Sequence, residues 1–344
     1  MAARVLLVEP WYAGSHQAWC EGLKRHSRHD IQLLTREPAG WKNTMRLSAA
    51  ELGARVESRP DLILASSMMD LAEFQQAAGL GDVPTLLYMH ENQLTYDRAR
   101  PDLERGAINW RSVLAADRTV FNSRFHLEDF FGTVGLVEAD HALIEDRRKR
   151  AAVLPVGIEI DPRLEPPRRD ADAPVILWNH RWEGDKVPLA FVEAIEALGD
   201  LPFRLLLLGN VSDSNRLRPR LVDRDPDRVI YSGHAPPQEY PDLLRLSDIA
   251  VSTAAQEFFG VSVAEAMAAG AIPLVPNRLA YPELLGSSLR SCLYQPGTLA
   301  NRLRDLLADP VSRAALRTEA KAAGARFGWR TVAPRYDEAI DSMV

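Results

Sequence analysis

The chain of 344 residues is poor in the features that mark secreted and membrane proteins. Its two cysteines, Cys20 and Cys292, are far apart and match no metal-ligand spacing, so we expect them to be reduced and buried, as in cytosolic proteins. No run of eighteen apolar residues occurs. The first residues lead directly into a short apolar stretch, Val5–Val8, without a basic leader. We therefore expect neither secretion nor a membrane-spanning segment.

An excess of positive charge is also lacking. Lys and Arg number 41 against 47 Asp and Glu, for a net charge of −6. This argues against general nucleic-acid binding, which depends on neutralising phosphates. Local basic clusters such as Arg147–Arg150 remain, and each of them also fits a solvated helix face. An enzyme that acts on one nucleoside needs a basic surface only beside its site, so the net charge does not exclude an RNA substrate.

What the chain does have is an alternation of short apolar runs with segments of helical length, without repeats or low-complexity tracts. This pattern is typical of βα units and parallel sheets. It predicts strands near residues 4–9, 31–35, 62–65, 85–89, 119–121, 175–178, 205–209, 229–233, 249–252, 272–275 and 292–294. It predicts helices near residues 16–26, 69–78, 106–115, 124–131, 188–197, 238–246, 262–269 and 298–307.

The length suits two domains of ordinary size. A Pro-rich, charged stretch interrupts the pattern and predicts a linker at 166–174. We therefore expect an α/β protein with two Rossmann-like, doubly wound parallel-sheet domains at 1–165 and 175–325. We expect the ligand to bind in the cleft between them.

Glu257 and Glu265 bracket a glycine-containing loop that runs into a predicted helix. A helix N-terminus offers free N–H groups to an anion, and carboxylates accept hydrogen bonds from sugar hydroxyls. A nucleotide sugar carries both kinds of group, so this segment is a candidate donor site. A structural alternative stays open, in which Ser262 and Glu265 form a capping box and Glu257 is a solvated loop acid.

Arg181 and Lys186 follow the predicted strand at 175–178. Ligands of open α/β sheets bind where strands end at their carboxyl side. A planar guanidinium and a compact ammonium are suited to grip the two phosphates of a leaving diphosphate. The alternative is two solvated loop cations, and the Glu257/Glu265 segment later in the same predicted domain makes this alternative less attractive.

An Arg-x4-Lys motif followed by Glu-x7-Glu resembles the retaining GT-B glycosyltransferases of family 4. Further segments, at 6–16, 87–93, 120–123 and 178–186, look like the tRNA-queuosine α-mannosyltransferase branch of that family. The resemblance spans nearly the whole chain. It implies transfer of mannose from GDP-mannose to the cyclopentene diol of queuosine in tRNA, with tRNA-Asp as the implied tRNA. It also implies retention of configuration, a cytoplasmic location, no membrane partner and a final helix, 326–344, that crosses back to the first domain.

The resemblance assigns roles to residues of both halves. Arg181, Lys186, Glu257 and His90 are the expected catalytic residues, with Glu257 on the mannose hydroxyls and Glu265 on the ribose diol. The expected donor-binding residues are Gly14, Ser15, His16, Gly209, Asn210, Gly233, His234, Phe258, Phe259, Gly260, Val261 and Glu265. We expect Gly14 to allow close backbone approach and Ser15 to cap the helix that follows.

The expected acceptor-side residues are polar or aromatic side chains of the first half: Glu91, Asn92, Asn109, Trp110, Arg111, Asn122 and Ser123. Two of them have structural alternatives, because Trp110 suits helix packing and Ser123 suits a helix cap. Asp225 and Asp227 form an Asp-x-Asp pair, but they sit among arginines, and we expect no metal ligand and no cofactor.

Two rivals remain. One is a family 4 transferase that uses a lipid, polysaccharide or small-molecule acceptor. The other is a non-catalytic module that binds nucleotide and tRNA, against which the intact pairs Arg181/Lys186 and Glu257/Glu265 argue.

Overall fold

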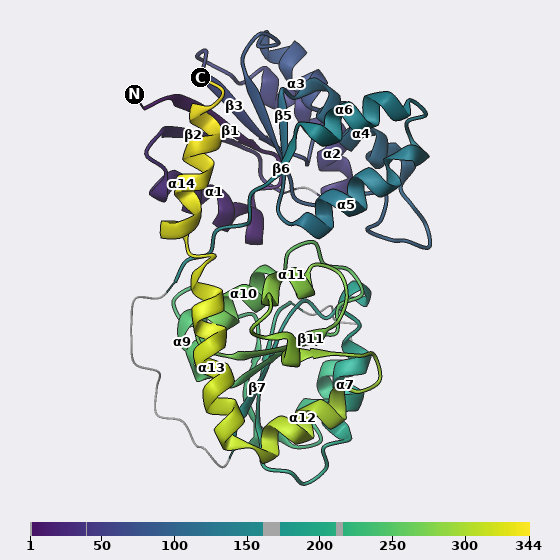
Figure 1. Cartoon of the computed structure of the whole chain (residues 1–344), viewed down its shortest axis with the longest axis vertical. Helices are drawn as coiled ribbons and strands as arrows, with labels where there is room; N and C mark the ends of the chain where they lie inside the picture. Colours follow the sequence, from purple (N-terminus) through teal and green to yellow (C-terminus); the bar gives the residue numbers. More distant parts are fainter. Residues whose placement is uncertain (1, 39, 161–172, 211–215) are drawn as a thin grey trace. The chain divides into compact units, whose positions relative to one another are not determined.

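The computed structural model describes residues 2–38, 40–160, 173–210 and 216–344, and these residues form two compact units (Figure 1). The first unit comprises Met1–Ile158 and Phe327–Val344, and the second comprises Glu159–Arg326. The expected boundaries lie at 165 and 325. Of the expected linker, 166–174, all but the last two residues fall outside the described ranges.

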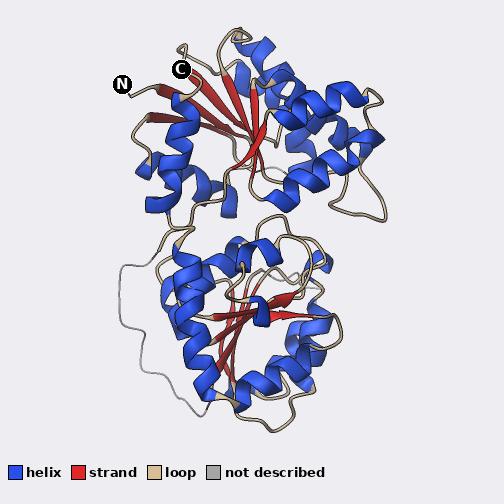
Figure 2. Cartoon of the chain, viewed as in Figure 1, coloured by secondary structure: helices blue, strands red, loops and turns tan. Residues whose placement is uncertain are grey.

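The first unit is built on a parallel six-stranded sheet. The sheet order is β2-β1-β3-β4-β5-β6, with β1 (Arg4–Glu9), β2 (Asp30–Thr35), β3 (Leu62–Ser66), β4 (Thr85–Met89), β5 (Arg118–Phe121) and β6 (Ala151–Val153). Every residue of β3 and β4 is buried, as in parallel sheets covered on both faces. Helices lie on both sides of the red strands in Figure 2.

The helices of the first unit are α1 (Gly14–His26), α2 (Trp41–Gly53), α3 (Leu71–Ala78), α4 (Leu103–Ala115), α5 (Arg124–Thr133), α6 (His141–Lys149) and α14 (Trp329–Asp341), with the 3-10 turn η1 (Val134–Leu136). The terminal helix α14 is part of this unit because it packs tightly against its first helix. A Cβ added at Gly22 would lie 2.0 Å from Trp329 Nε1, and Trp19 Nε1 donates to Tyr336 Oη at 3.0 Å.

The second unit repeats the plan with a parallel sheet in the order β12-β11-β10-β7-β8-β9. Its strands are β7 (Val175–Asn179), β8 (Arg204–Leu208), β9 (Val229–Gly233), β10 (Ile249–Val251), β11 (Ile272–Pro276) and β12 (Leu293–Tyr294). Its helices are α7 (Pro188–Glu196), α8 (Leu217–Val222), α9 (Tyr240–Leu246), α10 (Val261–Ala268), α11 (Tyr281–Leu285), α12 (Leu299–Ala308) and α13 (Pro310–Ala325), with 3-10 turns η2 (Gly184–Lys186), η3 (Pro226–Arg228) and η4 (Arg290–Cys292).

Each sheet has one point at which the direction of winding reverses. In the first unit the chain adds β2 on one side of β1 and β3 on the other. In the second unit it adds β8 on one side of β7 and β10 on the other. At such a switch point the loops after neighbouring strands diverge and leave a crevice at the carboxyl ends. The loops after β1, β7 and β10 are therefore the first places to look for a site.

Every expected strand and helix is present, with ends displaced by at most three residues. Six further elements were not expected: β6, α2, α6, α8, α11 and α13. Strand β6 has only three residues, Ala-Ala-Val, at the edge of its sheet, which is too short to give a pattern. Among the described residues, no helix is both long and apolar enough to cross a bilayer.

Candidate active site

The loop after β7 places Lys186 against the loop after β10. Lys186 Nζ donates to the Gln256 backbone oxygen at 2.9 Å and lies 3.3 Å from Glu257 Oε2 and 3.4 Å from Asp185 Oδ2. Its side chain is only 14% exposed. A cation with so little solvent needs these oxygens, so its position is well determined.

The backbone beneath Lys186 is strained. Val187 has a φ of +48°, in the left-handed region that a β-branched residue avoids. Thr253 Oγ1 donates to the backbone oxygens of Lys186 at 2.7 Å and Val187 at 3.0 Å. The Ala255 amide donates to the backbone oxygen of Asp185 at 2.8 Å. These bonds join the two loops and hold the strained conformation.

Glu257 connects the cation with the start of α10. Its Oε1 accepts from the Gly260 amide at 3.1 Å and the Phe259 amide at 3.4 Å, while Oε2 faces Lys186. Gly260 has a φ of +99°, and a Cβ there would meet Leu284 at 3.0 Å, so glycine is required at this turn. Two of the four expected donor-binding residues of this segment, Phe259 and Gly260, thus donate their amides to Glu257 itself. Phe258 and Val261 complete the segment, with Phe258 buried and Val261 partly exposed.

Glu265 lies on the second turn of α10 and does not form the capping box considered above. The helix begins at Val261 after Gly260, without a side-chain cap, so Ser262 is already helical. Glu265 Oε2 instead accepts from Tyr240 Oη at 2.7 Å, and Asn179 Nδ2 donates to the same hydroxyl at 2.7 Å. Burial raises the pKa of Glu265 to about 7, which the Tyr240 hydrogen bond partly offsets.

Arg181 is the more open of the two cations. Its side chain is 47% exposed and lies 2.8 Å from Glu183 and 3.5 Å from Asp185. It follows His180, a buried residue whose pKa falls to about 3 because of burial and the nearby Lys186 charge. A neutral His180 adds no further positive charge beside the two cations.

The ends of β8 and β9 supply the remaining donor-side residues of this unit. A Cβ at Gly209 would lie 2.2 Å from the His180 backbone oxygen, so only glycine allows the loops after β7 and β8 to meet. The Asn210 oxygen accepts from the Trp182 amide at 3.1 Å. The Gly233 oxygen accepts from the Gly209 amide at 3.1 Å, and His234 is exposed beyond it.

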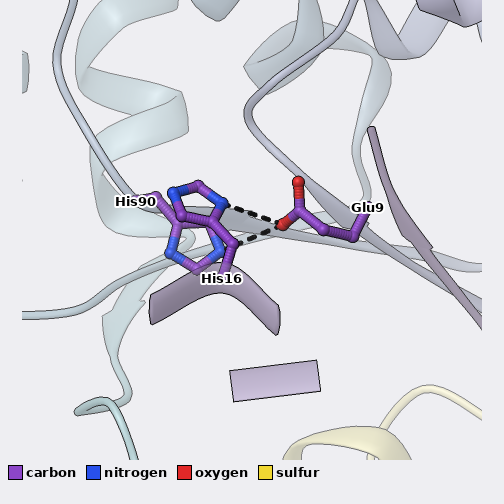
Figure 3. Close-up of side chains that lie close together, drawn as sticks. All are labelled: Glu9, His16 and His90. Carbon is purple, nitrogen blue, oxygen red and sulfur yellow. Dashed lines mark hydrogen bonds and ion pairs between the residues drawn. The ribbon is translucent and has the colours of Figure 1, made fainter. Parts of the chain in front are cut away.

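In the first unit, three buried side chains converge at the carboxyl ends of β1 and β4 (Figure 3). Glu9 Oε2 lies 3.0 Å from His16 Nδ1 and 3.6 Å from His90 Nε2. Glu9 Oε1 accepts from the Trp11 amide at 2.8 Å. Burial lowers the pKa of His90 well below its usual value. Burial also disfavours the charged form of His16, but the Glu9 carboxylate outweighs this and raises its pKa.

These three side chains are also the group among the described residues that could hold a metal ion, since their ligand atoms all lie within 4.8 Å of one another. The Asp225/Asp227 pair does not form such a group, and Asp225 pairs with Arg228 at 2.6 Å.

Gly14 and Ser15 precede His16 as exposed residues at the start of α1. Gly14 has a φ of +53°, which explains a glycine at this point. The expectation that Ser15 caps α1 is wrong, because the cap position is Ala13 and Ser15 already lies inside the helix. Ser15 is thereby left on the surface of the first helical turn.

The seven expected acceptor-side residues divide into internal and accessible ones. Asn92 donates to Asp129 and Thr133, Asn109 to the Ser67 oxygen, Trp110 to Glu138, and Asn122 to the His90 oxygen, while Ser123 caps α5 by accepting from the His126 amide. All five are buried. Glu91 is partly exposed, and Arg111 is exposed while paired with Asp70 at 2.7 Å. Five of the seven therefore support the loops from inside.

Sequence reasoning missed Glu9, Asp185, Asn179 and Tyr240. Glu9 is the last residue of an apolar strand and Asn179 the last of another, so a polar residue at a strand's carboxyl end was the available signal. Tyr240 starts α9 after an irregular segment, and nothing in the sequence connects it with Glu265.

Two family models match the two halves of the chain. Residues 4–158 match the family model described as tRNA-queuosine alpha-mannosyltransferase N-terminal, and residues 162–323 match that of glycosyl transferases group 1. The chain is 32% identical over 307 residues to the tRNA-queuosine alpha-mannosyltransferase of Drosophila melanogaster, with 81% of each chain covered.

Solved structures with low identity share the fold. Sucrose-phosphate synthase from Thermosynechococcus elongatus gives a TM-score of 0.75 at 18% identity, with 98% of each chain covered. The Anabaena protein HepE, in complex with UDP, gives 0.71 at 16% identity, with 98% of this chain and 100% of HepE covered. The two parallel sheets are those of GT-B glycosyltransferases, and the chain belongs to the tRNA-queuosine α-mannosyltransferase family.

Proposed function

We propose that this glycosyltransferase moves mannose from GDP-mannose to the cyclopentene diol of queuosine in tRNA, with retention at the anomeric carbon. Its family membership supports the acceptor and the sugar. The observation that carries the proposal is the charged set at the β7/β10 switch point, where Lys186 contacts Glu257 and Asp185, and Arg181 contacts the same Asp185. Such a set offers cations to a diphosphate and a carboxylate to a sugar.

Departure of GDP places negative charge on the diphosphate. Lys186 and Arg181 are suited to meet that charge, because both are already held close to oxygens that a diphosphate can replace: those of Asp185, Glu183 and Glu257. A fixed donor aimed at developing charge lowers the activation barrier by about 3 kcal/mol. With two cations so placed, the diphosphate needs no metal ion, and we propose that none assists its departure.

The two carboxylates bind hydroxyls of the donor. Glu257 is the candidate for the mannose hydroxyls because its Oε2 is turned toward Lys186. Glu265 is the candidate for the ribose diol, with Tyr240 as the group that holds its carboxyl before the ribose arrives. Retention without an assigned nucleophile fits attack from the face on which GDP leaves, so the carboxylate pairs of glycosidases are no guide here.

The first unit supplies the acceptor side. His90 and His16 are the candidates to touch the reacting sugars, and Glu91 and Arg111 are the acceptor-side residues with exposed surface. A tRNA substrate would place the reaction in the cytoplasm.

The test is to incubate the purified chain with GDP-mannose and bulk tRNA from cells that make queuosine, and then to weigh the digested nucleosides. We expect a hexose-mass increase on queuosine alone. Matched controls are tRNA from cells that lack queuosine and a reaction with UDP-glucose in place of GDP-mannose.

The other outcomes are informative. GDP release without a nucleoside of increased mass would keep the transferase and discard this acceptor, as the rival with a different acceptor predicts. Absence of both products would discard GDP-mannose as the donor and lead to a screen of other nucleotide sugars.

A further inference from the structure

The proposed transfer uses His16 and His90 as candidates to touch the sugars, but it gives no role to Glu9, the carboxylate that faces both of them. One carboxylate oxygen, Glu9 Oε2, is approached by two imidazole nitrogens from different parts of the chain (Figure 3). Glu9 is fully buried, and His16 and His90 are each 8% exposed. The second oxygen of Glu9 is already taken by the Trp11 amide, so the carboxylate is fixed with Oε2 turned toward both rings.

Hydrogen bonding alone leaves this cluster incomplete. One proton shared between Glu9 and His16 satisfies their 3.0 Å contact. His90 Nε2 is buried and makes no hydrogen bond to any described residue, since 3.6 Å from Glu9 is too long for one. A buried polar atom left without a partner costs about 1–3 kcal/mol. His90 Nε2 faces the same oxygen, Glu9 Oε2, as His16 Nδ1 does. One group bound between these three atoms would give each of them a partner.

A divalent metal ion has the right size and chemistry for that place. Zinc bonds of about 2.0–2.2 Å in a tetrahedron place neighbouring ligand atoms about 3.3–3.6 Å apart. Of the two contacts from Glu9 Oε2, the 3.6 Å contact to His90 lies at the upper end of this spacing and the 3.0 Å contact to His16 is shorter. The two rings are tilted by 31° with centroids 4.0 Å apart, and the three ligand atoms all lie within 4.8 Å of one another, so the rings have to rotate to close on one ion.

Two imidazoles and one carboxylate are a ligand set of zinc sites that keep a fourth position for water or substrate. We propose that Glu9, His16 and His90 bind one divalent transition-metal ion, with Zn²⁺ as the ion best suited to them. The ion joins the loop after β1 to the loop after β4. This departs from the expectation that the chain has no metal ligand, and it concerns a different place from the diphosphate grip of Lys186 and Arg181.

Sequence reasoning assigned His16 and His90 to donor binding and catalysis and did not identify a metal site, because the spacing of the three residues is not that of a metal motif. His16 and His90 are 74 residues apart, and Glu9 ends an apolar strand. Only the parallel order of β1, β3 and β4 brings them to one edge of the sheet.

The test uses the full chain, purified without a metal-affinity column and dialysed against metal-free buffer. Metal content is measured by mass spectrometry, and Co²⁺ is then titrated into the chelator-treated protein while visible absorption is recorded. We expect one ion per chain and the intense bands of a four-coordinate cobalt site. Glu9→Gln, which keeps an acceptor for the Trp11 amide, and His90→Gln should both lose the ion and the bands.

His141→Gln is the matched control, since His141 is an exposed histidine of the same unit. It should bind metal like the unaltered chain. Trace metal only and absent cobalt bands in the unaltered chain would overturn the proposal. Undiminished binding in His90→Gln would overturn it equally.

A variant that fails to fold, as judged by circular dichroism, is replaced by X-ray absorption on the unaltered zinc-loaded chain. That spectrum must show two imidazoles and an oxygen ligand, and a shell with fewer imidazoles contradicts the assignment. Added Zn²⁺ should also raise the melting temperature of the unaltered chain but not of Glu9→Gln. Because none of these readouts measures mannose transfer, the metal site and the proposed function stand or fall separately.

Discussion

Both sheets of this protein have polar groups at the carboxyl ends of their strands, but the two sets differ in how far they are exposed. At the carboxyl ends of the first sheet, Glu9, His16 and His90 are buried among aromatic rings and face one another. At the switch point of the second sheet, Lys186 and Glu257 are charged and 14% and 18% exposed, and Arg181 is nearly half exposed. The first set is enclosed by the fold. In the second set the cations are paired with carboxylates, and an incoming anionic ligand can replace those carboxylates.

The comparison predicts that function resides most heavily in the second set. The sharpest way to break it is Lys186→Met, which removes the ammonium but keeps most of the apolar stem. Loss of one fixed donor to developing charge should lower kcat by about 10²–10³. Steady-state transfer assays measure it, with Lys321→Met on an exposed surface of the same unit as the control. Equal rates in the two variants would show that Lys186 does not stabilise the leaving group.

Glu257→Gln separates the sugar from the diphosphate. The amide still has an oxygen for the Phe259 and Gly260 amides, but it no longer offsets the charge of Lys186. We expect GDP to bind at least as tightly as before, while transfer falls by about tenfold, the value of one charged hydrogen bond to a hydroxyl. Calorimetry with GDP and transfer assays measure the two effects. A parallel loss of both would assign Glu257 to the fold of the loop rather than to mannose.

Glu265 allows a test by proton release, because its pKa of about 7 leaves its carboxyl partly protonated at neutral pH. A ribose diol that donates to the carboxylate favours the charged form, so GDP binding at pH 7 should release about half a proton. Calorimetry in buffers of different ionisation enthalpy measures the number. Glu265→Gln should abolish the release.

The same shift has a consequence for stability. A folded-state pKa raised above the ordinary 4.5 means that the unbound protein favours the protonated carboxyl. The stabilisation that this raised pKa of Glu265 gives the folded protein is fully present below about pH 4.5 and is lost as the pH rises through about 7. In Glu265→Gln this loss should be missing from the urea-unfolding profile between those pH values. An unchanged profile would contradict the raised pKa.

The smallest effects are expected among the acceptor-side residues. Asn109→Ala removes bonds to the Ser67 oxygen and the Gln93 amide and should lower the free energy of unfolding by about 1–3 kcal/mol. Arg111→Ala, at the exposed end of the same segment, should change it by less than about 0.5 kcal/mol but weaken tRNA binding. Urea unfolding and tRNA titration measure them. A stability loss in Arg111→Ala as large as that in Asn109→Ala would remove the distinction between internal and accessible residues.

Much of this architecture could be read from short-range patterns. Apolar runs of four or five residues predicted the strands, because a strand buried on both faces has to be apolar throughout. Arg181 and Lys186 stood out because they follow such a strand, and Glu257 and Glu265 because they bracket a glycine-containing loop that runs into a helix. Helix α2, which was not expected, begins without a clear signal, since it follows Gly40 without a side-chain cap. Helix α13 does have a start signal that sequence reasoning missed, because Asp309 accepts from the Ser312 amide and Pro310 follows it. The roles of Asn92, Asn109 and Asn122 were equally hard to read, because a polar residue after a strand can face a ligand or its own fold.

By itself the sequence determined the alternation of strands and helices, the two-sheet plan and which charged residues leave the strand ends, because each depends on neighbours along the chain. The tertiary structure decided which of those groups meet. It turned the Phe259 and Gly260 amides onto Glu257, paired Glu265 with Tyr240, and brought His90 to Glu9 across eighty residues. Such pairings depend on sheet order and on the rotation of one loop against another, and local patterns carry no record of either.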